Sequence, residues 1–223
     1  MNLHKSFHFL LQLRENNNRS WFQENKKLYV TAKKEFESFI DALIPFVKEV
    51  DPEIDVMSSK ECLFRIYRDV RFSKNKLPYK TNFGAFIAKG GRKSPYAGYY
   101  IHLEPFESFI GGGIYMPESK YLRAIRTEIF EDSEKFKKII SDPDFLEYFN
   151  GIYGEKLKSA PRDFPKDFED IELLKYKHYA VTHTVGNEFW MSDNLFERII
   201  EIFKAQYPLN EFLNRVVERT VES

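Results

Sequence analysis

The stretch from Glu61 to Tyr115 constrains the fold most, because its pattern is that of short β-strands joined by tight turns. Four runs rich in aromatic and β-branched residues lie in it: "CLFRIYR", "FGAFIA", "AGYYIHLE" and "SFIGGGIY". Segments that contain Gly or Pro, such as "KGGRKSP" and "PFE", separate the later runs. Connections this short favour antiparallel neighbours, since parallel strands need crossovers of a dozen or more residues. The run "KHYAVTHTV" predicts one further strand, so we expect an antiparallel meander of about five strands.

The residues before this meander carry the spacing of helices. "KSFHFLLQLREN" predicts a short helix, and Ser20 with Gln23 fits a capping box that opens a longer one. We expect Pro45 to kink or end that longer helix. Its buried stripe recurs every seven residues, at Phe22, Tyr29, Phe36 and Leu43.

Helices are also expected after the meander. Pro117 suits the first position of one whose buried stripe includes Ile125. Residues 131–172 are acidic and helical in parts, and "APRDFPKDFED" predicts a surface loop. From Ser192 onward the pattern predicts two helices divided at Pro208. We therefore expect a single α+β domain over residues 1–223, with N-terminal and C-terminal helices packed on the meander.

Composition narrows the class of protein. The 223 residues include 22 Phe, 13 Tyr and 2 Trp, which indicates a core built on aromatic packing. Lys plus Arg and Asp plus Glu each number 34, which argues against binding of nucleic acid or membranes through net charge. The single cysteine, Cys62, excludes an intramolecular disulfide and a thiolate zinc cluster. We see no membrane span and no signal-peptide cleavage site, so we expect a cytoplasmic protein.

Positive charge is concentrated in one part of this neutral chain. Between Lys60 and Lys93 there are ten Lys or Arg residues against two acids, a local excess of eight charges. If "CLFRIYRDVRF" is a regular strand, Arg65, Asp69 and Arg71 share the face opposite its apolar side chains. Guanidinium groups match the oxygens of phosphate and carboxylate, and a carboxylate can hold one of them in place. The pattern thus predicts a site for an anion.

A purely structural interpretation of the same charges stays open. Acids elsewhere in the chain could neutralise them, and charged strand edges also prevent edge-to-edge pairing. Three features favour a site: the Pro-stiffened turn between Lys76 and Lys80, the glycines at 111–113 inside a strand pattern, and the cations Arg123 and Arg126 on the following helix. The glycines indicate a close approach by either a helix or a ligand.

His102 is the one histidine placed to carry protons. In "YYIHLE" it shares a strand face with Tyr100 and Glu104, although a structural histidine in a sheet is the more common case. His4 and His8 lie four apart without the intervening Glu of zinc hydrolases, so we expect no metal site. The chain has no phosphate-binding Gly loop, nucleophile elbow or dinucleotide fingerprint, and we expect no cofactor.

Four segments carry a family resemblance over nearly the full chain. In order, "NNNRSWFQENKKLY", "FRIYRDVRFSKNKLPYKTNFGAF", "GYYIHLEPFESFIGGGIYMPESKYLRAIR" and "LKSAPRDFPKDFEDIELLKYKHYAV" resemble the bacterial domain-of-unknown-function family 2461. The resemblance implies one full-length domain and specifies no reaction. The resemblance also implies that the family usually has Gly where this chain has Asp163, and often His-Pro where this chain has Phe168 and Glu169. The signature block that it emphasises is Arg65, Asp69, Arg71, Phe72, Lys76, Pro78, Tyr79 and Lys80.

Three hypotheses follow. In the first, a pocket binds a phosphate- or carboxylate-bearing small molecule, with Asp69 or His102 as the proton carrier if the protein is an enzyme. In the second, the same basic patch binds nucleic acid, with Tyr and Phe stacking on bases. In the third, the arginines pair with acids from 131–172 or from a protein partner, in a structural role. The candidate ligand-binding residues are Arg65, Arg68, Asp69, Arg71, Lys76, Tyr79, Lys80 and Arg126.

Overall fold

A computed structural model describes residues 3–222 as a four-stranded antiparallel sheet with helices at both ends of the chain, an α+β fold. The strands are β1 (Phe83–Ala88), β2 (Gly98–Leu103), β3 (Phe109–Ile114) and β4 (Tyr179–Thr184). They lie in the order β1-β2-β3-β4, so each strand pairs with its neighbour in sequence. The predicted meander is confirmed, but with four strands rather than about five.

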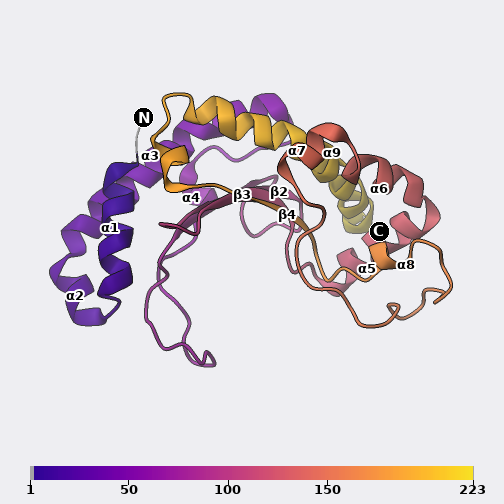
Figure 1. Cartoon of the computed structure of the whole chain (residues 1–223), viewed down its shortest axis with the longest axis horizontal. Helices are drawn as coiled ribbons and strands as arrows, with labels where there is room; N and C mark the ends of the chain where they lie inside the picture. Colours follow the sequence, from indigo (N-terminus) through magenta and orange to yellow (C-terminus); the bar gives the residue numbers. More distant parts are fainter. Residues whose placement is uncertain (1–2, 223) are drawn as a thin grey trace.

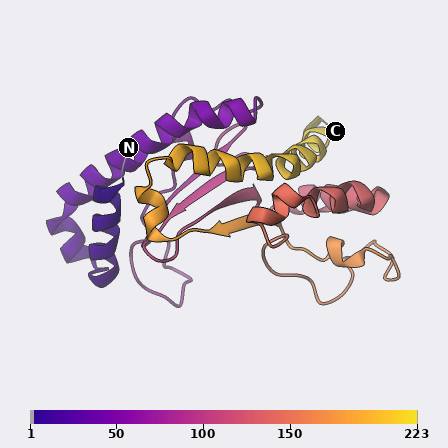
Figure 2. The same ribbon diagram turned by 45° about the horizontal axis from the view of Figure 1, so that its top comes forward.

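The missing strand is the one predicted for "CLFRIYRDVRF". Cys62 instead ends the short helix α4 (Ser59–Cys62), and the following residues form an extended arm. Only two isolated bridges hold this arm, Leu63 to Ala85 and Tyr67 to Tyr79. The residues beyond find no neighbouring strand, and without ladder hydrogen bonds β-forming side chains do not make a strand. We call residues 65–77 the basic arm; Figures 1 and 2 show it extending away from the helices.

Helices surround the sheet on one side and at its ends. The N-terminal ones are α1 (His4–Glu15), α2 (Arg19–Glu24) and α3 (Lys26–Val50). After β3 follow α5 (Ser119–Glu131), α6 (Ser133–Ile140), α7 (Pro143–Tyr148) and α8 (Ile171–Leu174). After β4 come the 3₁₀ turn η1 (Asn187–Met191) and α9 (Leu195–Glu222). None of the helices within residues 3–222 has the length and apolarity needed to span a membrane.

Helix boundaries differ from the sequence prediction at several points, one of which is Pro117: it lies outside α5, which begins at Ser119. The Asn18 side chain, not Ser20, caps α2 by accepting a hydrogen bond from the Trp21 amide, and α3 begins only after Asn25. Pro45 and Pro208 both lie inside continuous helices, so the predicted division at Pro208 is wrong. A proline removes one helical hydrogen bond, but both halves of each helix pack on the core, and that burial outweighs the loss.

Helices α3 and α9 cover one face of the sheet (Figures 1 and 2). Side chains alternate along strands, and the apolar side chains that face these helices are buried. Tyr99 of β2 packs its ring 4.7 Å from that of Phe203 on α9, and its hydroxyl donates to Asp51 beyond the end of α3. The predicted aromatic core is thus continuous from this layer to the rings around α1 and α2, which Phe83 of β1 joins to Phe36 of α3. The one-domain organisation stays a prediction.

The glycines of β3 allow close backbone approach rather than ligand contact. A Cβ on Gly112 would overlap the Gly98 carbonyl oxygen of β2 and approach the Gln206 side chain of α9. That carbonyl accepts hydrogen bonds from Gln206 and Asn210, at 2.9 and 3.3 Å. Gly112 has a φ of 152°, inside the region that favours glycine. The helix, not a ligand, is therefore the group that comes close at this position.

The root of the basic arm is fixed by an aromatic stack. The Tyr79 ring lies 4.0 Å from the ring of Phe22 on α2, at an interplanar angle of 12°. The Asn17 side chain bonds both the amide and the carbonyl of Tyr79. Tyr79 is buried, so its role in the structure is to anchor the arm and to place Lys80 next to β1.

The backbone conformation at Asp163 explains why the family resemblance implies a glycine at this position. Its φ is 73°, in the left-handed region that glycine adopts without strain. Its carboxylate lies 3.4 Å from the Arg123 guanidinium. Phe168, where the resemblance implies His, packs its ring 4.9 Å from that of Phe130. Both side chains make intramolecular contacts in this structure.

We predict that Gly112→Ala lowers the free energy of unfolding by about 2–4 kcal/mol, through overpacking against β2 and α9 and through backbone strain. Gly151→Ala is the matched control, because Gly151 also has a positive φ, of 97°, but a Cβ there meets nothing within 4 Å. The control should lose only about 1–2 kcal/mol. Urea unfolding of both variants measures the difference, and equal losses would contradict the close-approach argument.

Candidate functional site

The sheet face opposite α3 and α9 carries a groove of about 710 Å³. No helix layer covers this face in Figure 2. Strand pairing places its side chains in two rows across the sheet. The rows are Phe86, Tyr100, Gly111 and Thr182, and Gly84, His102, Phe109 and Thr184. The groove therefore follows from the same alternation that buries the other face.

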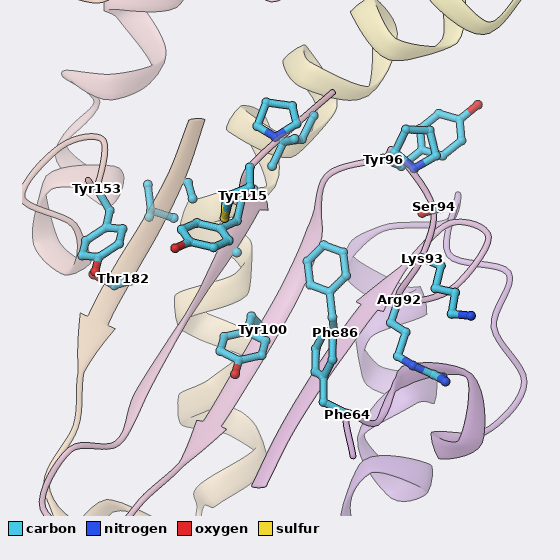
Figure 3. Close-up of a pocket in the computed structure, with 18 of the residues that line it drawn as sticks. Phe64, Phe86, Arg92, Lys93, Ser94, Tyr96, Tyr100, Tyr115, Tyr153 and Thr182 are labelled. Carbon is cyan, nitrogen blue, oxygen red and sulfur yellow. The ribbon is translucent and has the colours of Figure 1, made fainter. Parts of the chain in front are cut away.

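Aromatic side chains form most of the groove wall. Figure 3 shows Tyr100 and Phe86 at its centre, with Arg92 and Lys93 on one side and Tyr153 on the other. Further rings that line it are Phe64, Tyr96, Phe109, Tyr115 and Tyr121. Ligand pockets typically measure 300–1,000 Å³ and combine such rings with a few polar groups. The groove has the size and the lining of a small-molecule site.

Positive charge lies on one side of the groove. Lys80, Arg92 and Lys93 line it, against the single acid Glu118. The Lys80 ammonium is partly buried, 5.5 Å from the centre of the Phe64 ring. Burial lowers the pKa of Lys80, and the charges of Arg65 and Arg68 lower it further. A cation whose nearest charged neighbours are other cations attracts an anion.

A chain of hydrogen-bonded polar groups begins at Tyr100 and His102, which line the groove, and continues through Glu104 to Thr81. The Tyr100 hydroxyl lies 3.0 Å from Nδ1 of His102, and Nε2 of His102 lies 2.8 Å from Oε2 of Glu104. The other oxygen of Glu104 accepts a hydrogen bond from the Thr81 hydroxyl. The imidazole stacks on the Phe109 ring, 4.4 Å away and 14° from parallel. As strand alternation predicts, His102 shares a face with Tyr100 and Glu104.

The basic arm carries most of the other predicted ligand-binding residues, but outside the groove. Asp69 and Arg71 pair with each other at 2.7 Å, and both are exposed. The Lys76 ammonium donates to the Val70 carbonyl, and Arg68 donates to the Ser73 hydroxyl. Of the predicted set, only Lys80 and His102 line the groove.

Arg126 lies elsewhere in the molecule. It is on α5, partly buried, and donates to the Tyr176 carbonyl at 2.8 Å. Burial lowers the pKa of its guanidinium. It does not line the groove, so the structure does not bring it together with Lys80.

The acidic segment 131–172 forms its ion pairs away from the basic block. Asp170 pairs with Lys137 and Glu172 with Lys175. Of the ten cations from Lys60 to Lys93, only Arg71 and Lys89 have carboxylate partners within residues 3–222, which leaves eight without one. This arrangement does not fit the closed salt bridges that the structural hypothesis predicts with residues 131–172.

Sequence reasoning did not predict the aromatic wall of the groove. It also did not place Arg92 and Lys93 in a site, or identify Glu104 as the partner of His102. The alternation of "YYIHLE" is the signal that could have identified Glu104. Tyr115 and Tyr153 have no such signal, because their approach to the groove depends on how distant segments pack. Within the described residues, no group of three or more His, Cys, Asp or Glu side chains is placed to hold a metal ion.

We predict that Glu104→Gln destabilises the protein by about 1.5–3 kcal/mol at pH 7, the range for hydrogen bonds to charged groups. Burial raises the pKa of Glu104, but hydrogen bonds with His102 and Thr81 outweigh it and hold this pKa below its ordinary value. Because the folded-state pKa is the lower one, the stabilisation is full above the unfolded value of about 4.3 and is lost as the pH falls through the folded pKa.

Urea unfolding of wild type and Glu104→Gln between pH 3 and pH 8 measures this. The difference in unfolding free energy should shrink once the pH drops below about 4. A difference that stays constant over the whole range would show that the substitution perturbs packing rather than charge.

Comparison with known proteins agrees with the resemblance noted from the four segments. A family model described as a conserved hypothetical protein, DUF2461, matches residues 5–212. No curated protein and no solved structure matches the chain. The family match runs from α1 into α9 and so includes the whole sheet and the groove on its open face. On this match, the chain belongs to the DUF2461 family.

Proposed function

We propose that the groove on the open face of the sheet binds a small anionic ligand that carries a phosphate or carboxylate group. The observation that supports this most is the position of Lys80, Arg92 and Lys93. All three line an aromatic groove of about 710 Å³, and none has a carboxylate partner among the described residues. Arg92 also donates to the backbone carbonyls of Lys60 and Glu61. Cations without a carboxylate partner beside an apolar hollow supply both the charge and the contact area that such a ligand needs.

In this proposal the two parts of the ligand have different contacts. The anionic group lies on the side of Lys80, Arg92 and Lys93, and the body of the ligand packs on Phe86 and Tyr100. Arg65 and Arg68 strengthen the positive potential at Lys80, as their effect on its pKa indicates, without lining the groove. Asp69 and Arg71, which pair with each other, have no part in it.

We predict that one class of phosphate or carboxylate compound raises the thermal midpoint of the protein by roughly 5–10 °C. A ligand at 100 times its dissociation constant adds about 2.7 kcal/mol of stability, and 1 kcal/mol corresponds to about 2–4 °C in a protein of this size. Thermal unfolding against a panel of nucleotides, sugar phosphates, aryl phosphates and organic acids measures the shift.

Two variants locate the binding site in this assay. Lys80→Ala should abolish the shift, because it removes the partly buried cation. Lys74→Ala removes the same charge from an exposed position on the basic arm and should keep the shift. If no compound shifts the midpoint, or if both variants lose the shift equally, the groove is not the anion site.

A second candidate function, binding of single-stranded nucleic acid, is favoured by the basic arm itself. The arm has five cations, at Arg65, Arg68, Arg71, Lys74 and Lys76, against Asp69. Phe72 is 95% exposed, and the Arg71 guanidinium lies 5.9 Å from its ring centre. An exposed ring among cations is what base stacking on a charged strand requires.

For this candidate we predict that Phe72→Ala weakens binding of a fluorescent oligothymidine by about 1–3 kcal/mol, the contribution of one stacked base. Lys74→Ala should reduce the slope of log K against log salt by about 0.7, the value for one phosphate contact on a single strand. Fluorescence anisotropy measures both. Binding that weakens in Lys80→Ala but not in Phe72→Ala would assign the nucleic acid to the groove instead of the arm.

A further inference from the structure

The chain from Tyr100 through His102 to Glu104 has the geometry of a proton relay. One imidazole nitrogen, Nε2, lies 2.8 Å from a carboxylate oxygen of Glu104, and the other, Nδ1, lies 3.0 Å from the Tyr100 hydroxyl. A hydroxyl, an imidazole and a carboxylate in this order are the three parts of an activated nucleophile or base. No other histidine of the described residues is bonded to both a hydroxyl and a carboxylate.

The neighbours of His102 select its tautomer. An ionised carboxylate only accepts hydrogen bonds, so Glu104 requires the proton on Nε2. The other nitrogen faces the Tyr100 hydroxyl and, at 3.4 Å, the amide nitrogen of Asn82, which only donates. Nδ1 is therefore an unprotonated acceptor, and the Tyr100 hydroxyl donates to it.

The packing around Tyr100 and His102 holds this arrangement in place. Phe109 stacks on the imidazole at 4.4 Å and fixes its plane. Gly84 leaves space for the Tyr100 hydroxyl, since a Cβ at Gly84 would lie 2.7 Å from that oxygen. Thr81 holds the second oxygen of Glu104. Each member is thus oriented before any ligand arrives, which is the condition for efficient proton transfer.

We propose that Tyr100 is the proton carrier of the groove and that His102 and Glu104 activate it, so that the protein is an enzyme that transfers protons to and from its bound ligand. This rests on the proposed function, because the ligand is the anion held beside Lys80. A proton leaves the ligand for the Tyr100 oxygen as the Tyr100 proton passes to Nδ1 of His102. The ligand becomes its conjugate base, and the imidazolium is stabilised by Glu104. Reversal returns the proton.

The state of the Tyr100 hydroxyl explains why a relay is needed. Burial raises the pKa of Tyr100, and the nearby charge of Glu104 raises it further. The phenol therefore stays protonated at neutral pH and becomes basic only when His102 accepts its proton. A tyrosine without a base behind it could not do the same work.

Covalent labelling with benzenesulfonyl fluoride tests the activated oxygen directly. The Tyr100 oxygen forms a bond to sulfur as the S–F bond breaks, fluoride leaves, and the phenol proton passes to His102. Peptide mapping by mass spectrometry measures the rate at each tyrosine. Tyr115 and Tyr153 line the same groove and are 63% and 51% exposed, and neither hydroxyl is bonded to a histidine within residues 3–222. Tyr100 should nevertheless be labelled fastest.

The variants separate activation from exposure. His102→Asn should slow labelling of Tyr100 at least about 100-fold, the lower range for a lost general base, and leave Tyr115 and Tyr153 unchanged. Glu104→Gln keeps an acceptor for Nε2 and is the second variant if His102→Asn does not fold; it should also slow Tyr100 selectively. Labelling of Tyr100 at the rate of Tyr115 and Tyr153, or insensitivity to these variants, would overturn the relay.

A spectroscopic measurement completes the test. Imidazole ¹⁵N NMR of the full chain should show the His102 proton on Nε2, and a proton on Nδ1 would overturn the assignment. Because the sulfonyl fluoride is uncharged, Lys80→Ala should still be labelled at Tyr100. If Tyr100 is labelled selectively but no anion binds, the proposed anion site is refuted and the activated tyrosine is retained. Failure of the proposed function is therefore distinguishable from failure of the relay.

Discussion

The rest of the structure depends on the contact between α9 and the middle of the sheet, where the Gly98 carbonyl oxygen accepts hydrogen bonds from Gln206 and Asn210. Gly112 makes this approach possible, because any side chain there would occupy the same space. The contact draws α9 against β2 and β3, and α3 packs beside it. One face of the sheet is thereby sealed by helices, and the chain has no comparable layer for the other within residues 3–222.

An open sheet face of this kind needs polar or aromatic cover, and here it has both. The Phe109 ring packs against Tyr100 and His102, and the hydrogen bonds from Tyr100 through His102 to Glu104 satisfy these polar groups without a second helical layer. The Lys80 ammonium is not stabilised in this way, because the charges of Arg65 and Arg68 repel it. The face therefore combines polar groups that are hydrogen-bonded to one another with a lysine that has no carboxylate partner in the described residues, and this combination is the basis of the binding function proposed above.

The sequence allowed the helices, four of the strands and the shared face of Tyr100, His102 and Glu104 to be predicted, because these follow from local periodicity. It did not allow us to predict that "CLFRIYRDVRF" forms an extended arm instead of a strand. That segment has the side chains of a strand, but pairing depends on a neighbour supplied by the tertiary fold, and only Leu63 and Tyr67 find one. The predicted placement of Arg71 on a strand face was wrong for the same reason, because a residue can be assigned to a strand face only where a strand forms. Pro208 was misjudged because burial along α9 outweighs one lost hydrogen bond.

The groove draws its walls from the two ends of the sheet, with Phe64 before β1 and Thr182 on β4. All of the helices from α5 to α8 lie between these two residues in the chain. No contiguous fragment shorter than this span contains both walls. The groove is consequently a property of the assembled fold. A ligand of the kind proposed would stabilise both β1 and β4 in the sheet, and its binding would be linked to the cooperative folding of all four strands.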